Sequence, residues 1–115
     1  MDEQAAARAE RDERILDVIR SLREGEVVTY GGIAADAGYP KLSRLVGRLL
    51  ALGGGSEDDL EEAEEELPWW RVVNSAGRLV PGNEREQAAQ LRAEGVEVRD
   101  GRVRNAPVGR FSRPR

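Results

Sequence analysis

Apolar residues recur at intervals of three and four along the first half of the chain, which is the spacing of one face of an α-helix. The first such stretch predicts a helix over residues 12–24, and its apolar members are Ile15, Val18, Ile19 and Leu22. Thr29 is a good N-cap for a second, shorter helix over residues 30–37. A third helix is predicted over residues 41–52, with an apolar stripe formed by Leu42, Leu45, Val46, Leu49 and Leu50. The second and third helices, joined by a short turn, match a helix-turn-helix.

Shorter elements are predicted in the second half of the chain. Two extended pieces, over residues 71–74 and 78–80, flank a turn of small residues. A helix over residues 84–94 follows, with Asn83 as its N-cap and Gly95 at its end. Asp100-Gly101 then lies between two short apolar pieces and is a strong hairpin signal. The whole pattern predicts a mostly α-helical domain with a small β component, of the helix-turn-helix or winged-helix type.

The length of 115 residues allows one domain with a modest core. We expect this domain to span residues 1–103, with an acidic loop inserted at residues 53–67 and a basic, flexible tail over residues 104–115. The insertion holds eight acidic residues and no basic one between residues 57 and 66, and we expect it to be a solvated loop. Without those eight residues the net charge changes from −4 to +4, and 17 of the 18 basic residues are arginine. Arginine suits phosphates and base edges, although a charge of this size is weak evidence for DNA binding.

The chain shows neither a signal-peptide pattern nor an apolar segment of membrane-spanning length. We therefore expect a monomeric, cytoplasmic protein that makes no membrane contact and is associated with the nucleoid if it is prokaryotic.

The most unusual local feature is Pro68-Trp69-Trp70-Arg71-Val72-Val73, in a sequence with no cysteine and no histidine. Two flat aromatic surfaces beside a cation suit the binding of a planar group such as a nucleobase. The missing thiol and imidazole remove the usual nucleophile, the usual general base and most zinc sites. We therefore expect a binding protein, not an enzyme, with no cofactor and no metal.

The same tryptophan pair is also consistent with ordinary core residues. On an extended segment, adjacent side chains point to opposite faces. This geometry predicts that Trp69 and Arg71 share one side and that Trp70, as a wall or core residue, lies on the other.

Three separated pieces resemble the DNA-binding domain of the O6-alkylguanine-DNA alkyltransferases. They are Thr29-Tyr30-Gly31 with Ile33-Ala34, Pro40 with Ser43-Arg44-Leu45-Val46-Gly47, and Pro68-Trp69-Trp70-Arg71-Val72-Val73-Asn74. The resemblance spans residues 15–98. It is closer to the alkyltransferase-like proteins, which keep the fold but carry tryptophan in place of the acceptor cysteine.

The resemblance implies roles for individual residues. Tyr30 would rotate the target nucleotide outward, and Arg44 would enter the base stack and fill the gap. The minor groove would be contacted by the helix that carries Ser43, Leu45 and Gly47. Trp69 takes the position of the acceptor cysteine and would line the lesion pocket, together with Trp70, Arg71 and Val72.

One further position departs from the enzymes. Glu94 matches the glutamate that orients their catalytic histidine, but the residue in the position of that histidine is Trp70. We therefore expect Glu94 to be structural.

The resemblance also implies a function. The protein would recognise O6-alkylguanine in double-stranded DNA by minor-groove binding and nucleotide flipping, without catalysing a reaction. It would flag the damage for nucleotide excision repair proteins. The alternative is a winged-helix DNA-binding regulator without lesion specificity.

Overall fold

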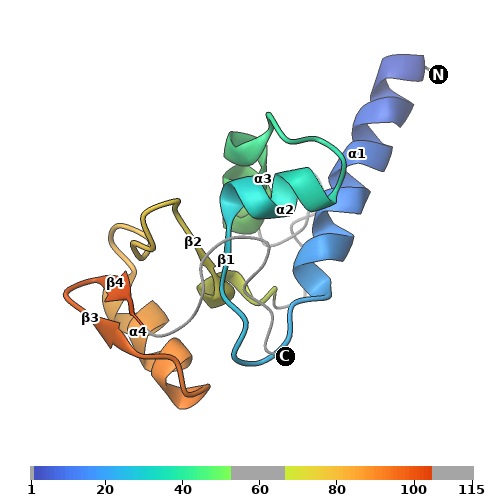
Figure 1. Ribbon diagram of the computed structural model, residues 1–115. Helices are drawn as coiled ribbons and strands as arrows, with labels where there is room; N and C mark the ends of the chain where they lie inside the picture. Colours follow the sequence, from blue (N-terminus) through green and yellow to red (C-terminus); the bar gives the residue numbers. More distant parts are fainter. Residues whose placement is uncertain (1, 53–66, 105–115) are drawn as a thin grey trace.

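The computed structural model of the chain describes residues 2–52 and 67–104 (Figure 1). The acidic run at residues 57–66 and the tail beyond Arg104 lie outside the described residues. The elements in chain order are α1 (Glu3–Arg20), β1 (Val28–Thr29), α2 (Tyr30–Asp36), α3 (Ser43–Ala51), the 3₁₀ turn η2 (Trp69–Arg71), β2 (Val72–Val73), α4 (Glu84–Ala93), β3 (Val98–Arg99) and β4 (Arg102–Val103). The prediction of a mostly α-helical fold with a small β component is confirmed. No described helix is both long enough and apolar enough to cross a membrane.

The first helix differs from its prediction at both ends. α1 begins nine residues earlier than expected, where the Asp2 side chain accepts a hydrogen bond from the Gln4 backbone N–H at 3.0 Å. Its early residues are exposed and consist of charged residues, glutamine and alanine, so they favour a helix through propensity and produce no apolar stripe. At the other end α1 stops at Arg20, with Ser21 as its C-cap. Figure 1 shows the N-terminal part of α1 projecting away from the rest of the molecule.

The helix-turn-helix is confirmed. The Thr29 side chain accepts a hydrogen bond from the Gly32 backbone N–H at 2.9 Å and so caps α2 as predicted. α3 begins two residues later than predicted, after Leu42, which makes no side-chain cap bond. Both helices pack with α1 around one hydrophobic cluster, which we call the first cluster; its members include Ile15, Ile19, Ile33, Val46, Leu49 and Val72.

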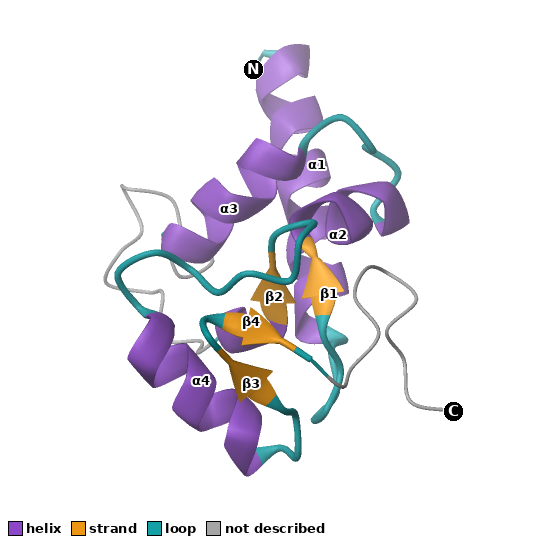
Figure 2. Cartoon of the chain, turned by 60° about the vertical axis from the view of Figure 1, so that its left-hand side comes forward, coloured by secondary structure: helices purple, strands orange, loops and turns teal. Residues whose placement is uncertain are grey.

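A second cluster forms beneath α4, from Val27, Val73, Leu79, Ala88, Leu91, Val96, Val98 and Val103. The parallel pair β1–β2 lies between the two clusters, with Val28 opposite Val72 and Thr29 opposite Val73 (Figure 2). Adjacent strand residues point to opposite faces, so Val72 enters the first cluster and Val73 the second. This short pair therefore fixes the tryptophan segment between the helix-turn-helix and α4.

The remaining predictions are partly confirmed. Residue 71 is not in a strand, because residues 69–71 form η2, and the strand expected at 78–80 is reduced to a single bridge between Arg78 and Arg102. Asn83 occupies the N-cap position of α4, but its side chain makes no cap bond. The antiparallel hairpin β3–β4 forms around Asp100 and Gly101, whose φ angles of 55° and 72° suit a tight turn.

Candidate nucleic-acid interface

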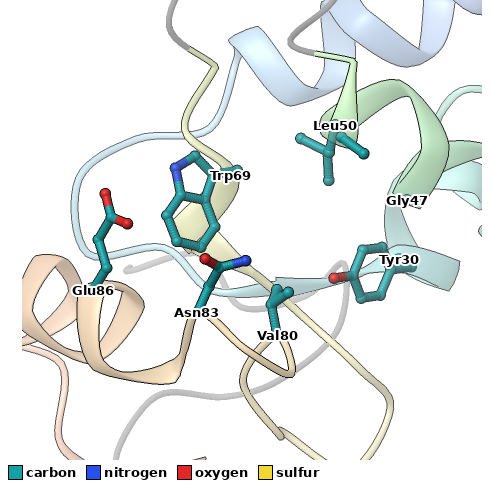
Figure 3. Close-up of a pocket in the computed structure, with 8 residues that line it drawn as sticks. Tyr30, Gly47, Leu50, Trp69, Val80, Asn83 and Glu86 are labelled. Atoms are coloured by element: carbon teal, nitrogen blue, oxygen red, sulfur yellow. The ribbon is translucent and has the colours of Figure 1, made fainter.

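A cavity of about 360 Å³ opens between the helix-turn-helix on one side and η2 with the start of α4 on the other (Figure 3). It is lined by Tyr30, Gly47, Leu50, Ala51, Trp69, Val80, Asn83 and Glu86. The structure thus brings together three residues that the sequence placed in the interface, Tyr30, Gly47 and Trp69. Tyr30 and Gly47 lie at one end of the view, and Glu86 lies beyond Trp69 at the other.

Trp69 reaches this cavity because residues 69–71 turn. The Trp69 backbone N–H donates to the Leu67 carbonyl at 2.7 Å, and the Arg71 N–H donates to the Pro68 carbonyl at 3.1 Å. The rings of Trp69 and Trp70 lie edge to face, with centroids 6.3 Å apart and planes at 86°. One indole therefore borders the cavity, while the other packs against the second cluster.

Arg71 lies with Trp70, not with Trp69. Its guanidinium carbon is 5.3 Å from the centroid of the Trp70 ring. The expectation that Arg71 shares the side of Trp69 is wrong, because it assumed a strand. In a 3₁₀ turn successive side chains are about 120° apart and do not alternate between two faces.

Glu94 joins these residues into one buried network. Its carboxylate accepts hydrogen bonds from Trp70 Nε1 at 2.7 Å, from Arg71 Nη2 at 2.7 Å and from the Gly25 backbone N–H at 2.9 Å. Arg71 also donates from Nη1 to the Leu22 carbonyl at 3.0 Å. The side chains of Arg71 and Glu94 are only 14% and 8% exposed. The network connects η2 to the end of α4 and to the loop after α1, which agrees with the structural role expected for Glu94.

The charge state of Glu94 follows from these contacts. Burial alone opposes its ionisation, but the hydrogen bonds from Arg71, Gly25 and Trp70 and the charge of Arg71 outweigh that effect. They hold the pKa of the Glu94 carboxyl below its ordinary value. Tyr30 shows the opposite case, since burial raises the pKa of its phenol.

Gln87 is a fully buried residue that the sequence reasoning missed. Its Nε2 donates to the carbonyls of Trp70 and Val72 at 3.1 and 3.0 Å, and its Oε1 accepts from the Val80 N–H at 2.7 Å. It therefore fixes α4 against η2, β2 and the loop that contributes Val80 to the cavity. The available signal was its position, one helical turn before the buried Leu91 on the inward face of α4.

The other predicted DNA-contacting residues lie on α3 outside the cavity. Arg44 is exposed, and Ser43 is partly exposed at the start of the helix. Leu45 is half-buried and packs against the first cluster, so its side chain serves the core as well as the surface. Tyr30 lies against α3 at Gly47, where an added Cβ would be 3.7 Å from Tyr30 Cε1.

Three residues expected in the lesion pocket do not line the cavity. Val72 is fully buried and pairs with Val28 in the short parallel sheet. Trp70 and Arg71 are held by Glu94. Residues that line the cavity but were not expected there are Leu50, Ala51, Val80, Asn83 and Glu86. Leu50 and Ala51 had a signal, because they lie three and four residues after Gly47 on the same face of α3.

Comparison with known proteins agrees with this geometry. Residues 10–96 match the family model of the 6-O-methylguanine DNA methyltransferase DNA-binding domain. The DNA base-flipping protein of Vibrio parahaemolyticus is 44% identical over 87 residues, which cover 74% of this chain and 79% of that protein. The DNA base-flipping protein of Escherichia coli is 39% identical over 90 residues, 75% of this chain and 62% of that protein.

Similarity extends to a eukaryotic relative of known structure. Alkyltransferase-like protein 1 of Schizosaccharomyces pombe is 32% identical over 89 residues, 74% of this chain and 75% of that protein. The crystal structure of S. pombe Atl1 in complex with damaged DNA containing O6-carboxymethylguanine matches with a TM-score of 0.62. That match has 32% identity and covers 79% of this chain and 81% of the other. The chain therefore belongs to the family of the 6-O-methylguanine DNA methyltransferase DNA-binding domain, and within it to the alkyltransferase-like proteins.

Proposed function

We propose that this protein recognises O6-alkylguanine in double-stranded DNA by rotating the damaged nucleotide out of the helix and into the cavity beside Trp69. The observation that carries the proposal is the position of Trp69, which borders a cavity shared with Tyr30 and Gly47 of the helix-turn-helix. Relatives named as DNA base-flipping proteins, and the complex of S. pombe Atl1 with DNA containing O6-carboxymethylguanine, support it.

The energies of flipping and stacking favour a lesion over an intact base. Rotating a base out of the duplex costs a few kcal/mol, and less when the base already pairs badly. Stacking on an aromatic side chain such as Trp69 returns about 1–3 kcal/mol. A side chain inserted at the vacated step, the role proposed for the exposed Arg44, supports the distorted duplex. These contributions nearly cancel for guanine, so the weaker pairing of O6-alkylguanine decides the outcome.

We propose further that binding proceeds without alkyl transfer and that the complex marks the damage for nucleotide excision repair proteins. The sequence contains no cysteine or histidine to accept the alkyl group or to activate an acceptor. The indole N–H of Trp70 is bonded to Glu94 and offers no base to position 69. A stable complex that leaves the lesion in place is useful only to a partner that removes it.

A paired titration tests the recognition step. Two duplexes of one sequence, with guanine or O6-methylguanine at the central position, are titrated into the protein while tryptophan fluorescence is followed. We expect tighter binding of the damaged duplex and quenching of Trp69. Equal affinity for the two duplexes would refute lesion recognition, and a preference for one undamaged sequence would favour a regulator.

A second experiment tests the proposal that no alkyl group is transferred to the protein. We expect Trp69→Cys to gain no methyl group from an O6-methylguanine duplex, because no neighbouring base would generate the thiolate. Intact-protein mass spectrometry measures the transfer, with unreacted variant as the control. A stoichiometric mass increase of one methyl group would show that this reasoning is wrong.

A further inference from the structure

The cavity beside Trp69 has one charged lining residue among those the structure describes, and that residue is acidic. Glu86 comes from the first turns of α4, next to Asn83, while the remaining lining residues are aromatic, aliphatic or glycine. Figure 3 shows the Glu86 carboxylate on the far side of Trp69 from Tyr30 and Gly47. A carboxylate at this end of the cavity would lie next to any group of a bound base that extends beyond Trp69.

No cation neutralises Glu86 within the described part of the chain. Its carboxylate takes part in no ion pair or hydrogen bond there. The nearest basic residue in sequence, Arg85, borders a separate shallow hollow that also touches Glu86, and it does not line the cavity. The helix N-terminus favours acidic residues in general, and Glu84 in the same turn meets that preference without lining the cavity.

The chemistry of guanine determines which atoms would face Glu86. The glycosidic bond joins guanine to the DNA backbone at one edge of the base, and O6 lies on the opposite, Watson–Crick edge. A base entering from the α2–α3 side therefore leads with the edge that carries O6 and its substituent. That edge advances past Trp69 toward the α4 end, where Glu86 and Asn83 lie.

We propose that Glu86 makes this cavity selective for the charge of the O6 substituent. Neutral and cationic substituents are accepted, and a substituent that ends in a carboxylate is disfavoured by repulsion between like charges. This inference rests on the proposed function and adds the class of lesion to it. The anionic adduct to test is O6-carboxymethylguanine, which the structure of S. pombe Atl1 contains.

The size of the effect follows from the exposure of Glu86. Two like charges a few ångströms apart repel strongly in a dry site, but Glu86 is solvent-exposed and water screens it. We therefore expect about twofold to fivefold discrimination, not complete exclusion. The discrimination should shrink as salt concentration rises.

The test uses the full chain and four duplexes of one sequence. The central base is guanine, O6-methylguanine, O6-carboxymethylguanine or its neutral amide, O6-carbamoylmethylguanine. The last two have nearly the same size and shape, so the ratio of their dissociation constants compares a charged substituent with a neutral one. The proteins are the wild type, Glu86→Gln, and Glu84→Gln as a matched control that removes the same charge two residues away.

We expect the wild type to bind the carboxymethyl duplex about twofold to fivefold more weakly than the carbamoylmethyl duplex. Glu86→Gln should bring that ratio close to one, and Glu84→Gln should leave it near the wild-type value. A ratio near one in the wild type, or a ratio unchanged in Glu86→Gln, overturns the inference while O6-methylguanine is still preferred over guanine. If guanine and O6-methylguanine bind equally, the proposed function fails and this inference fails with it.

Discussion

Trp69 and Trp70 are adjacent in the sequence, but their surroundings differ. Trp70 donates its indole N–H to Glu94, lies beside the Arg71 guanidinium and packs against the second cluster. Trp69 borders an open cavity, and its indole N–H makes no hydrogen bond within the described residues. The difference shows that two adjacent residues of one turn can have separate roles. The hydrogen-bonded Trp70 stabilises the fold, and Trp69 faces a cavity where a ligand can bind. In the 3₁₀ turn the two rings lie edge to face, with planes at 86°, and each meets different surroundings.

The contrast extends to the residues around each tryptophan. On the Trp70 side, Arg71, Glu94 and Gln87 are largely buried, and each makes several hydrogen bonds. On the Trp69 side, Asn83 and Glu86 are exposed at the start of α4. We therefore expect substitutions on the first side to reduce stability and substitutions on the second to change binding.

The largest loss of stability is expected from Glu94→Ala. This change leaves the buried Arg71 guanidinium without its carboxylate and removes the acceptor for Trp70 Nε1, a loss of about 3–5 kcal/mol in the free energy of unfolding. Urea denaturation measures it. Glu10→Ala is the control, because Glu10 pairs with Arg14 on the exposed face of α1 and is 64% exposed. If both variants lost the same small amount, the network would not be stabilising.

A smaller loss is expected from Gln87→Leu. The variant leaves the Val80 N–H and the carbonyls of Trp70 and Val72 without their partner, which should cost about 2–3 kcal/mol of unfolding free energy. Gln90→Leu on the same helix is the control and should change stability by less than about 0.5 kcal/mol. Equal stability of Gln87→Leu and the wild type would contradict the role given to Gln87.

The pH dependence of stability tests the role of Glu94 in the network around Trp70. The lowered pKa of Glu94 means that the native state binds its proton more weakly than the unfolded state does. The corresponding stabilisation is fully present at neutral pH and is lost as the pH falls through the native pKa. Glu94→Gln cannot titrate, so its unfolding free energy should fall less steeply below neutral pH than that of the wild type. Parallel curves for the two proteins would contradict this origin of the shift.

Sequence patterns predicted the elements whose signals are local. Thr29 before α2, the apolar stripe of α3 and Asp100-Gly101 in the hairpin each act over a few residues. The start of α1 has no apolar stripe, so periodicity could not find it. The turn at residues 69–71 has no sequence signature of its own, so the extended geometry predicted for this segment is wrong.

The residues of the site that were predicted correctly from the sequence were those that match the family's motifs. Resemblance placed Tyr30 and Trp69 in the interface, and both line the cavity. The contacts of Arg71 with Glu94 join residues 23 positions apart, and the place of Glu86 depends on how α4 packs on η2. Such tertiary contacts cannot be predicted from the spacing of residue types along the sequence.

The most direct measurement compares Trp69→Ala and Trp70→Phe in the paired titration of O6-methylguanine and guanine duplexes. We expect Trp69→Ala to weaken binding of the damaged duplex by about 1–3 kcal/mol and to remove most of the preference for the lesion. Trp70→Phe should lose about 1 kcal/mol of stability with the Glu94 hydrogen bond and keep the preference. A preference retained in Trp69→Ala, or lost in folded Trp70→Phe, would contradict the assignment of Trp69 to the lesion and Trp70 to the fold.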